Sequence, residues 1–224
     1  MTPSSRRNRA MSLQRKDITD AIKKARQVSK KRRFEQTFEL AINLRELDMK
    51  RPENRINLRV QLPNGIGGQK VLVFASGDLA LRARRSGADE VIEPAELSEL
   101  AKDKKAAKKR LKGFDIFISE APLMPTVGRV AGPILGPRGK MPTPVPPQAP
   151  VDNVIERERR AIVLRTRDKM FCHCMVGREN MTDEQVAQNI ETVLTNLIGA
   201  TKRGYGNIKS IYLKTTMGEA VKLY

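Results

Sequence analysis

Residues 56–75 read INLRVQLPNGIGGQKVLVFA, and the pattern of apolar residues changes within this stretch. From Ile56 to Leu62, apolar and polar residues alternate, which is typical of a strand with one face in water. The turn-forming residues of LPNGIGG then interrupt any regular element. Val71–Ala75 is a continuous apolar run, which favours a strand buried on both faces. The change indicates two kinds of sheet, one on each side of this break.

The alternating pattern occurs towards both ends of the chain. It predicts strands at residues 37–44, 56–62, 161–167, 170–176 and 208–215. Two amphipathic helices accompany these strands. The first runs from a cap at Ser12 to about Arg33, and the second runs to about Ile198 from a capping box formed by Thr182 and Gln185.

The middle of the chain follows a β-α-β-α-β order, which indicates a small parallel sheet. The predicted strands are 71–75, 90–92 and 114–119, and the predicted helices are 78–85 and a lysine-rich one at about 95–109. A segment dense in proline and glycine, GPILGPRGKMPTPVPPQAP at residues 132–150, follows this unit. Its last part is read as a linker.

These two patterns predict a fold of two domains. An α+β domain is expected from both termini, residues 1–67 plus 151–224, and an α/β domain at residues 68–150 is inserted into it. Linkers near residues 65–68 and 142–150 would form a hinge. The alternative is two domains in sequence, which would leave the first helix and two strands with too little sheet of their own.

Basic residues are concentrated at one end of the chain. The 224 residues carry a formal charge of +18, and residues 1–33 alone hold 12 basic and 2 acidic residues. Such an excess indicates a polyanionic partner, with nucleic acid first and an anionic membrane second. Lys30, Lys31, Arg32 and Arg33 are the expected electrostatic contacts, although a solvated basic helix would carry the same run. No apolar run approaches the roughly 18 residues of a membrane span.

Motifs for catalysis and metal binding are weak. Cys172-His173-Cys174 places two cysteines on one side of a predicted strand and the chain's single histidine on the other, which is too few ligands for a zinc site. The cysteines are better explained as small buried side chains. The loop Gly136–Lys140 has glycines and cations, but Pro137 removes a backbone donor, so a rigid structural loop is favoured over a nucleotide site. We therefore expect no enzyme, no cofactor and no metal.

Two further stretches suit RNA contact, each with a plain structural alternative. Thr215-Thr216-Met217-Gly218 follows a predicted strand, where a hydroxyl beside a glycine allows close approach to a sugar-phosphate edge, but an ordinary turn is equally consistent. Phe34 follows the four cations and is either a core anchor or an aromatic beside a phosphate track. Because only 4% of residues are aromatic and none is Trp, an extensive base-stacking surface is not expected.

Several segments, taken in order along nearly the whole chain, match one family. They are Arg33-Phe34-Glu35-Gln36-Thr37, Leu62-Pro63-Asn64-Gly65-Ile66-Gly67, Gly132-Pro133-Ile134-Leu135-Gly136-Pro137-Arg138-Gly139-Lys140-Met141-Pro142, Asp168-Lys169, Val176-Gly177-Arg178, Ser210 and Thr215-Thr216-Met217-Gly218. On these residues the chain resembles the large-subunit ribosomal protein family called ribosomal protein L-one, the protein of the mobile lateral stalk. Thr143-Pro144-Val145-Pro146-Pro147 and the short chain resemble the archaeal form.

The resemblance implies a split βαβ domain with an inserted Rossmann-like three-layer domain. It implies binding to the stalk region of large-subunit rRNA, repression of translation through binding its own mRNA, and help in releasing deacylated tRNA from the exit site. It also implies a cytoplasmic, ribosome-associated protein that is a monomer when free and has no membrane partner. By motif position the RNA-binding residues would be Phe34, Thr37, Asp168, Lys169, Ser210, Thr216, Met217 and Gly218.

This contact set suits RNA because carboxylate and hydroxyl groups can hydrogen-bond to ribose hydroxyls. One departure from the family lies between Lys169 and Val176, a stretch one residue shorter than in bacterial members. Two other hypotheses stay open at this point. A nuclease or RNA-modifying enzyme would fit the basic α/β unit, and a general DNA-compacting protein would fit the charge alone.

Overall fold

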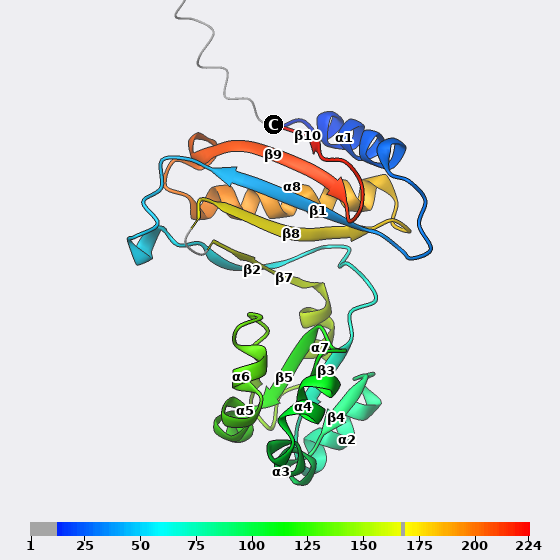
Figure 1. Cartoon of the computed structure of the whole chain (residues 1–224), viewed down its shortest axis with the longest axis vertical. Helices are drawn as coiled ribbons and strands as arrows, with labels where there is room; N and C mark the ends of the chain where they lie inside the picture. The colour runs from blue at the N-terminus through cyan, green and yellow to red at the C-terminus, as the bar shows by residue number, and fades with distance from the viewer. Residues whose placement is uncertain (1–12, 167–168) are drawn as a thin grey trace, which may run out of the picture. The chain divides into compact units, whose positions relative to one another are not determined.

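The computed structural model describes residues 13–166 and 169–224 (Figure 1). It has a mixed α/β fold with both antiparallel and parallel sheets. The chain divides into two compact units. The terminal unit comprises the residues up to Ile66 together with Arg160–Tyr224, and the inserted unit comprises Gly67–Arg159.

The terminal unit is built on a four-stranded sheet in the order β10-β9-β1-β8. Its strands are β1 (Thr37–Leu44), β8 (Phe171–Arg178), β9 (Ile208–Thr215) and β10 (Val221–Lys222). Because β1 runs antiparallel to both β8 and β9, those two strands are parallel to each other with β1 between them. Helix α8 (Asp183–Ala200) connects them. A separate antiparallel pair joins β2 (Asn57–Gln61) to β7 (Ala161–Arg165).

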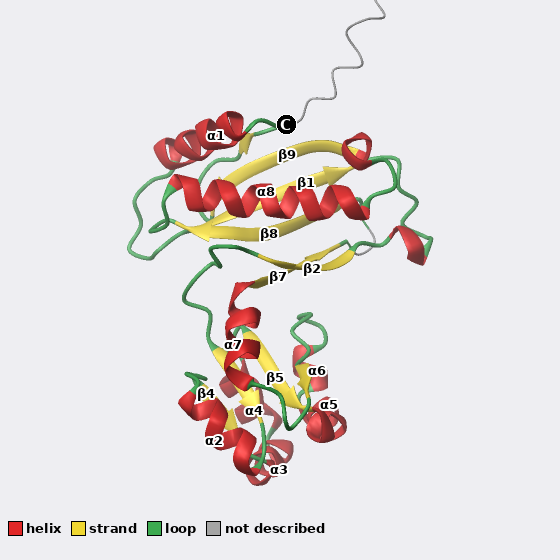
Figure 2. Ribbon diagram, turned by 180° about the vertical axis from the view of Figure 1, so that it is seen from behind, coloured by secondary structure: helices red, strands yellow, loops and turns green. Residues whose placement is uncertain are grey.

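Helices cover one face of the four-stranded sheet. Strand β1 buries Phe38, Leu40, Ile42 and Leu44 on that face and leaves the alternate residues half-buried. The buried side chains pack against α8 and α1 (Arg15–Val28) in one apolar core. Figure 2, seen from behind, shows α8 in front of the sheet, whereas in Figure 1 the strands face the viewer. Among the described residues of this unit, no helix covers the second face, which we call the open face.

The inserted unit has a wholly parallel sheet in the order β4-β3-β5-β6. Its strands are β3 (Val71–Phe74), β4 (Glu90–Ile92), β5 (Ile116–Glu120) and β6 (Thr143–Val145). Val71 and Val73 pack with α2 (Gly77–Arg85) and α7 (Val151–Arg160) on one side. Leu72 and Phe74 pack on the other side with helices α3 (Pro94–Lys102), α4 (Lys104–Leu111), α5 (Met124–Val130) and α6 (Gly132–Leu135). The continuous apolar run at β3 is therefore buried on both faces, as predicted.

Two predicted helices differ from those observed. The first helix ends at Val28 and not near Arg33, so the cations at 30–33 lie in the irregular segment that precedes β1. The predicted cap at Ser12 lies outside the described residues, and the observed N-cap is Gln14. The lysine-rich helix is two helices separated at Asp103, whose side chain accepts hydrogen bonds from the N–H groups of Lys105 and Ala106. Asp103 starts a second helix because it satisfies two of that helix's free backbone donors.

The proline- and glycine-rich segment is more regular than predicted. It contains α6 and the strand β6, which joins the parallel sheet beside β5. Helix α7 follows directly, and its Val151 and Ile155 are buried in the core of the inserted unit. Residues 151–159 consequently belong to the inserted unit, whereas the sequence placed them in the terminal domain. Short proline-bounded elements of this kind give no hydrophobic period long enough to recognise.

A glycine on β8 allows the close packing of α8 on the sheet. A Cβ added at Gly177 would lie 2.9 Å from Cγ2 of Val186 and 3.3 Å from Sδ of Met181. Val186 is fully buried on α8 and cannot yield without moving the helix. The substitution Gly177→Ala is expected to reduce the free energy of unfolding by about 1–3 kcal/mol, the usual cost of overpacking. Urea denaturation measures this change.

The matched control is Gly199→Ala, also in the terminal unit. Gly199 lies near the end of α8, is exposed, and has no atom within 4 Å of an added Cβ. Alanine there is expected to raise the free energy of unfolding by roughly 0.5–1 kcal/mol, since glycine is a poor helix former. Equal effects of the two substitutions would contradict the proposed packing of β8 against α8.

Candidate nucleic-acid interface

The buried side chain of Gln36 holds three segments together at one end of the terminal sheet. Its Nε2 donates to Oγ of Ser29 at 2.9 Å and to the carbonyl oxygen of Lys30 at 3.1 Å. Its Oε1 accepts from the backbone N–H of Met217 at 3.2 Å. Gln36 is 0% exposed, and these bonds satisfy the amide at both ends. The segment after α1, the start of β1 and the turn after β9 are therefore fixed relative to one another.

Thr216 adds a second link between the same strands. Its Oγ1 accepts from the N–H of Thr37 at 3.0 Å and donates to the carbonyl oxygen of Thr37 at 3.3 Å. Thr215 donates its hydroxyl to Oγ of Ser29 at 2.9 Å. The Thr216 hydroxyl thus has an internal structural role, and it retains one lone pair that can accept a further hydrogen bond.

Gly218 closes the turn after β9. Its N–H donates to the carbonyl oxygen of Thr215 at 3.0 Å, and an added Cβ would clash with the Thr215 hydroxyl oxygen. Any side chain at this position would displace a hydroxyl that is already bonded to Ser29. We call this set of residues the Gln36 cluster: Ser29, Gln36, Thr37, Thr215, Thr216, Met217 and Gly218.

Two large apolar side chains are exposed at this end of the sheet, Met217 within the Gln36 cluster and Phe34 two residues before Gln36. Phe34 is 52% exposed and Met217 is 60% exposed. Phe34 is therefore not a core anchor, which removes one of the two interpretations that its sequence context allowed. The neighbouring Glu35 accepts a hydrogen bond of 3.0 Å from Arg178 Nη1. This bond restrains the segment that leads into β1. Exposed apolar groups on a rigid support are suited to packing on a base or ribose.

The four predicted cations lie beside this surface. Lys30, Lys31, Arg32 and Arg33 are all exposed in the segment between α1 and β1. Arg26, which belongs to the same basic stretch at residues 1–33, has a structural role. Its guanidinium donates to Asp183 Oδ1 at 2.8 Å and to the carbonyl oxygens of Glu179 and Met181, and it lies 5.0 Å from the centre of the Phe38 ring.

Ser210 and Lys169, the remaining predicted residues that the structure describes, lie at the far end of the sheet. Ser210 stands opposite Asn43 and accepts a hydrogen bond of 2.9 Å from its side-chain amide. Lys169 is exposed in the turn before β8, and Asp168 lies outside the described residues. Ser210 and Thr216 are six residues apart, about 20 Å along an extended strand. The predicted residues that the structure describes therefore form two groups at opposite ends of the sheet.

The open face connects these two groups. Across it, the strand register places Met175, Glu39 and Lys214 in one row and His173, Ala41 and Tyr212 in the next. Phe171 is 42% exposed and Met175 is 45% exposed. The rings of Phe171 and His173 stack with centroids 6.0 Å apart at 23°. The open face thus exposes aromatic and thioether side chains. They lie between the cations at residues 30–33 at one end of the sheet and Lys169 at the other end.

Sequence analysis missed Gln36 as a structural centre and missed the exposed side chains of β8. Side chains alternate between the two faces of a strand. Since Cys172 and Cys174 share one face of β8, Phe171, His173 and Met175 lie on the other face. Both cysteines are buried, and burial raises the pKa of the Cys172 thiol to about 11. Burial, with a smaller contribution from Cys172, also raises the pKa of Cys174. The thiols are accordingly packing groups.

Other candidate sites offer little chemistry. Lys140 of the basic loop donates to Asp115 Oδ1 at 3.0 Å and to the carbonyl oxygen of Phe114, so its charge is already paired. At the carboxyl edge of the parallel sheet, Glu120 accepts from both the N–H and the hydroxyl of Ser76. A carboxylate at the start of α2 disfavours a bound phosphate there. Among the described residues, no three potential ligands are grouped as a metal site, and no helix could span a membrane.

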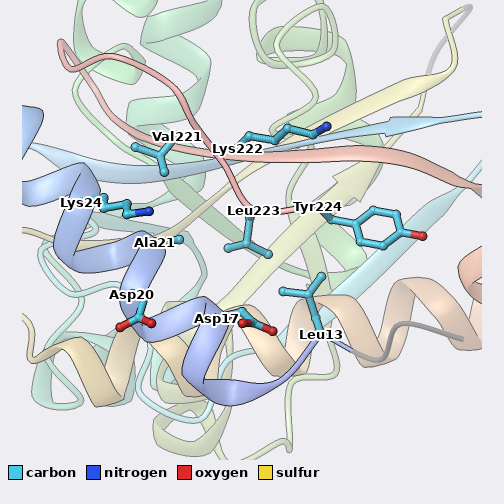
Figure 3. A pocket seen from close by; sticks show the side chains of 9 residues that line it. All are labelled: Leu13, Asp17, Asp20, Ala21, Lys24, Val221, Lys222, Leu223 and Tyr224. Carbon is cyan, nitrogen blue, oxygen red and sulfur yellow. The ribbon is translucent and has the colours of Figure 1, made fainter. Parts of the chain in front are cut away.

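A pocket of about 320 Å³ lies between α1 and the C-terminal strand (Figure 3). It contains none of the predicted site residues. Asp17 on its wall accepts from the N–H of Gln14 and so belongs to the cap of α1. The pocket is lined by Leu13, Asp17, Asp20, Ala21, Lys24, Val221, Lys222, Leu223 and Tyr224.

Comparisons with known proteins agree with the motif order. The model of the ribosomal protein L1p/L10e family matches residues 22–219. The large ribosomal subunit protein uL1 of Archaeoglobus fulgidus is 50% identical over 209 residues, which cover 93% of this chain and 95% of that protein. The proteins of the same name from Pyrococcus horikoshii and Methanocella arvoryzae are 46% and 44% identical, over 95% and 93% of this chain and 98% and 99% of theirs. The chain belongs to the ribosomal protein L1p/L10e family.

Proposed function

We propose that the chain is a structural protein of the large ribosomal subunit that binds large-subunit rRNA at the mobile stalk. The Gln36 cluster carries this proposal, because it holds the exposed Met217 by hydrogen bonds, and the exposed Phe34 and four exposed cations come just before Gln36 in the chain. A buried polar network in which every donor and acceptor is hydrogen-bonded makes the surface above it rigid and holds it in one conformation. A surface of fixed shape with apolar tips and adjacent positive charge is suited to one folded RNA site.

The two kinds of residue have different roles in this proposal. Lys30, Lys31, Arg32 and Arg33 attract the phosphate backbone and contribute to affinity for any RNA. Phe34, Met217 and the open face select the RNA by packing on bases and riboses. Ser210 and Lys169 contact the RNA at the far end of the same face, and Thr37, Thr216 and Gly218 hold the turn in place. Asp168 is proposed as a contact on the resemblance alone.

The finer parts of the function are also proposals. The same surface would bind the protein's own mRNA and so repress its translation, and the protein would assist release of tRNA from the exit site. The two compact units would correspond to the split βαβ domain and the inserted Rossmann-like domain of the family. We propose no enzymatic activity, a cytoplasmic, ribosome-associated location, and a monomeric free state.

The exposed apolar residues give the first test. Phe34→Ala and Met217→Ala are each expected to weaken binding to a stalk rRNA fragment by about 1–3 kcal/mol, the usual value of one stacked contact. Both side chains are more than half exposed, so the urea midpoint should stay unchanged. Leu81→Ala in the inserted unit is the control, because Leu81 is also 52% exposed. Unchanged RNA affinity in both variants would rule out this surface as the RNA site.

The cations give a second test that separates attraction from selection. Replacing Lys30, Lys31, Arg32 and Arg33 with Gln should reduce the slope of log affinity against log salt by roughly 3, at about 0.7–0.9 per phosphate contact. The Met217→Ala variant should weaken binding without changing that slope. Equal affinity of the unaltered protein for duplex DNA and the stalk RNA would instead support a DNA-compacting protein.

A further inference from the structure

The positive charge of the inserted unit is concentrated on one short helix. Residues 102–112 hold seven basic and one acidic residue, whereas the other residues of 67–159 hold nine basic and eleven acidic ones. The unit is therefore slightly acidic except at α4 and its two flanks. We call the exposed lysines of this stretch the α4 lysine face; they are Lys102, Lys104, Lys105, Lys108, Lys109 and Lys112.

These lysines lie on the solvent side of α4 in two adjacent rows. Lys104, Lys108 and Lys112 follow one another at four-residue intervals, about 6 Å apart along the axis. Lys105 and Lys109 form the neighbouring row. The opposite side of the helix buries Ala107 and Leu111 in the apolar core of the inserted unit. Packing thus fixes which side of the helix presents the charge.

No carboxylate neutralises this face. Within the part of the chain that the structure describes, none of the six lysines forms an ion pair, although thirteen ion pairs form elsewhere. Arg110 on the same helix contrasts with them, because it is paired with both Glu90 and Glu96. The lysine charges are left free for a ligand outside the chain.

The arrangement is unfavourable for the helix itself. Like charges four residues apart repel each other, and α4 contains two such pairs, Lys104 with Lys108 and Lys105 with Lys109. Lys104 and Lys105 also occupy the first turn, where the helix dipole disfavours positive charge. An anionic ligand would relieve both effects. A merely solvated helix surface would gain from mixed charges, which this face lacks.

We propose that the α4 lysine face is a second RNA-binding surface, which contacts the phosphate backbone without reading sequence. Lysine provides a mobile point charge and no planar fork, which suits phosphate attraction more than base recognition. A membrane surface is disfavoured, because the face has no large apolar side chain to insert beside the charges. RNA is the polyanion chosen because the proposed function places the chain beside rRNA, and to that extent the inference rests on the proposed function.

The test uses the full-length chain and an RNA duplex of about 20 base pairs that is unrelated to rRNA. Lys104, Lys105, Lys108 and Lys109 are replaced together with Gln, a residue of similar helix propensity. The matched control replaces Lys70, Arg85, Arg129 and Arg138 with Gln, which removes the same charge from exposed positions spread over the same unit. Binding is measured by titration at several salt concentrations.

The α4 variant should bind the duplex at least about tenfold more weakly at roughly 0.1 M salt, with the salt slope reduced by about 2–3. The control should change the slope by less than about 1. The melting temperature of the α4 variant should be equal or higher, because repulsion within the helix is removed. Leu81→Ala removes an exposed apolar side chain of the same unit and should leave binding to this duplex unchanged. Affinity for a stalk rRNA fragment is measured in parallel, so failure of the proposed stalk site can be told apart from failure of this inference.

Two results would overturn the proposal. The first is an equal loss of binding in the α4 variant and the dispersed control, which would mean that only net charge matters. The second is unchanged RNA binding together with loss of binding to phosphatidylserine-containing vesicles, which would identify the face as a membrane contact.

Discussion

One buried amide, that of Gln36, fixes the end of the terminal sheet. It connects the segment after α1 to the turn after β9, where Met217 lies 181 positions beyond Gln36 in the chain. An amide buried without partners would cost about 1–3 kcal/mol for each unsatisfied group, so the three segments cannot separate freely. The position of Met217 follows from this constraint, because its own backbone N–H donates to Gln36, and Phe34 lies two residues before Gln36 in the segment that leads into β1.

The same constraint explains why α1 stops at Val28. Ser29 accepts hydrogen bonds from Gln36 and Thr215, and its backbone is extended. The basic residues that follow leave the helix and lie beside the exposed apolar tips. In the proposed function, attraction and selection of the RNA are thus assigned to neighbouring but separate residues. The α4 lysine face would supply attraction alone, on a unit that is otherwise slightly acidic.

Sequence patterns were sufficient to place a helix or strand where its apolar residues repeat with a long, regular period. The strands β1, β3 and β9 and the capping box of α8 lie close to their predicted positions because burial repeats at regular intervals there. The patterns failed where a single side chain decides the outcome. Asp103 breaks one predicted helix in two, and α7 follows a proline-rich stretch with too few turns to be recognised. For the candidate site, motifs proposed Phe34, Thr216 and Met217, which the structure places at one end of the terminal sheet, but Gln36 was not predicted because its partners lie far from it in the sequence.

The central claim is that Gln36 acts on RNA by holding Met217 in place. A double-mutant cycle with Gln36→Met and Met217→Ala tests it directly, since Met retains the volume of Gln and removes its hydrogen bonds. Affinity for a stalk rRNA fragment is measured for both single variants and the double variant. The account predicts that the double variant binds about as weakly as the weaker single one. Losses that simply multiply would show that the two residues act independently and would contradict it.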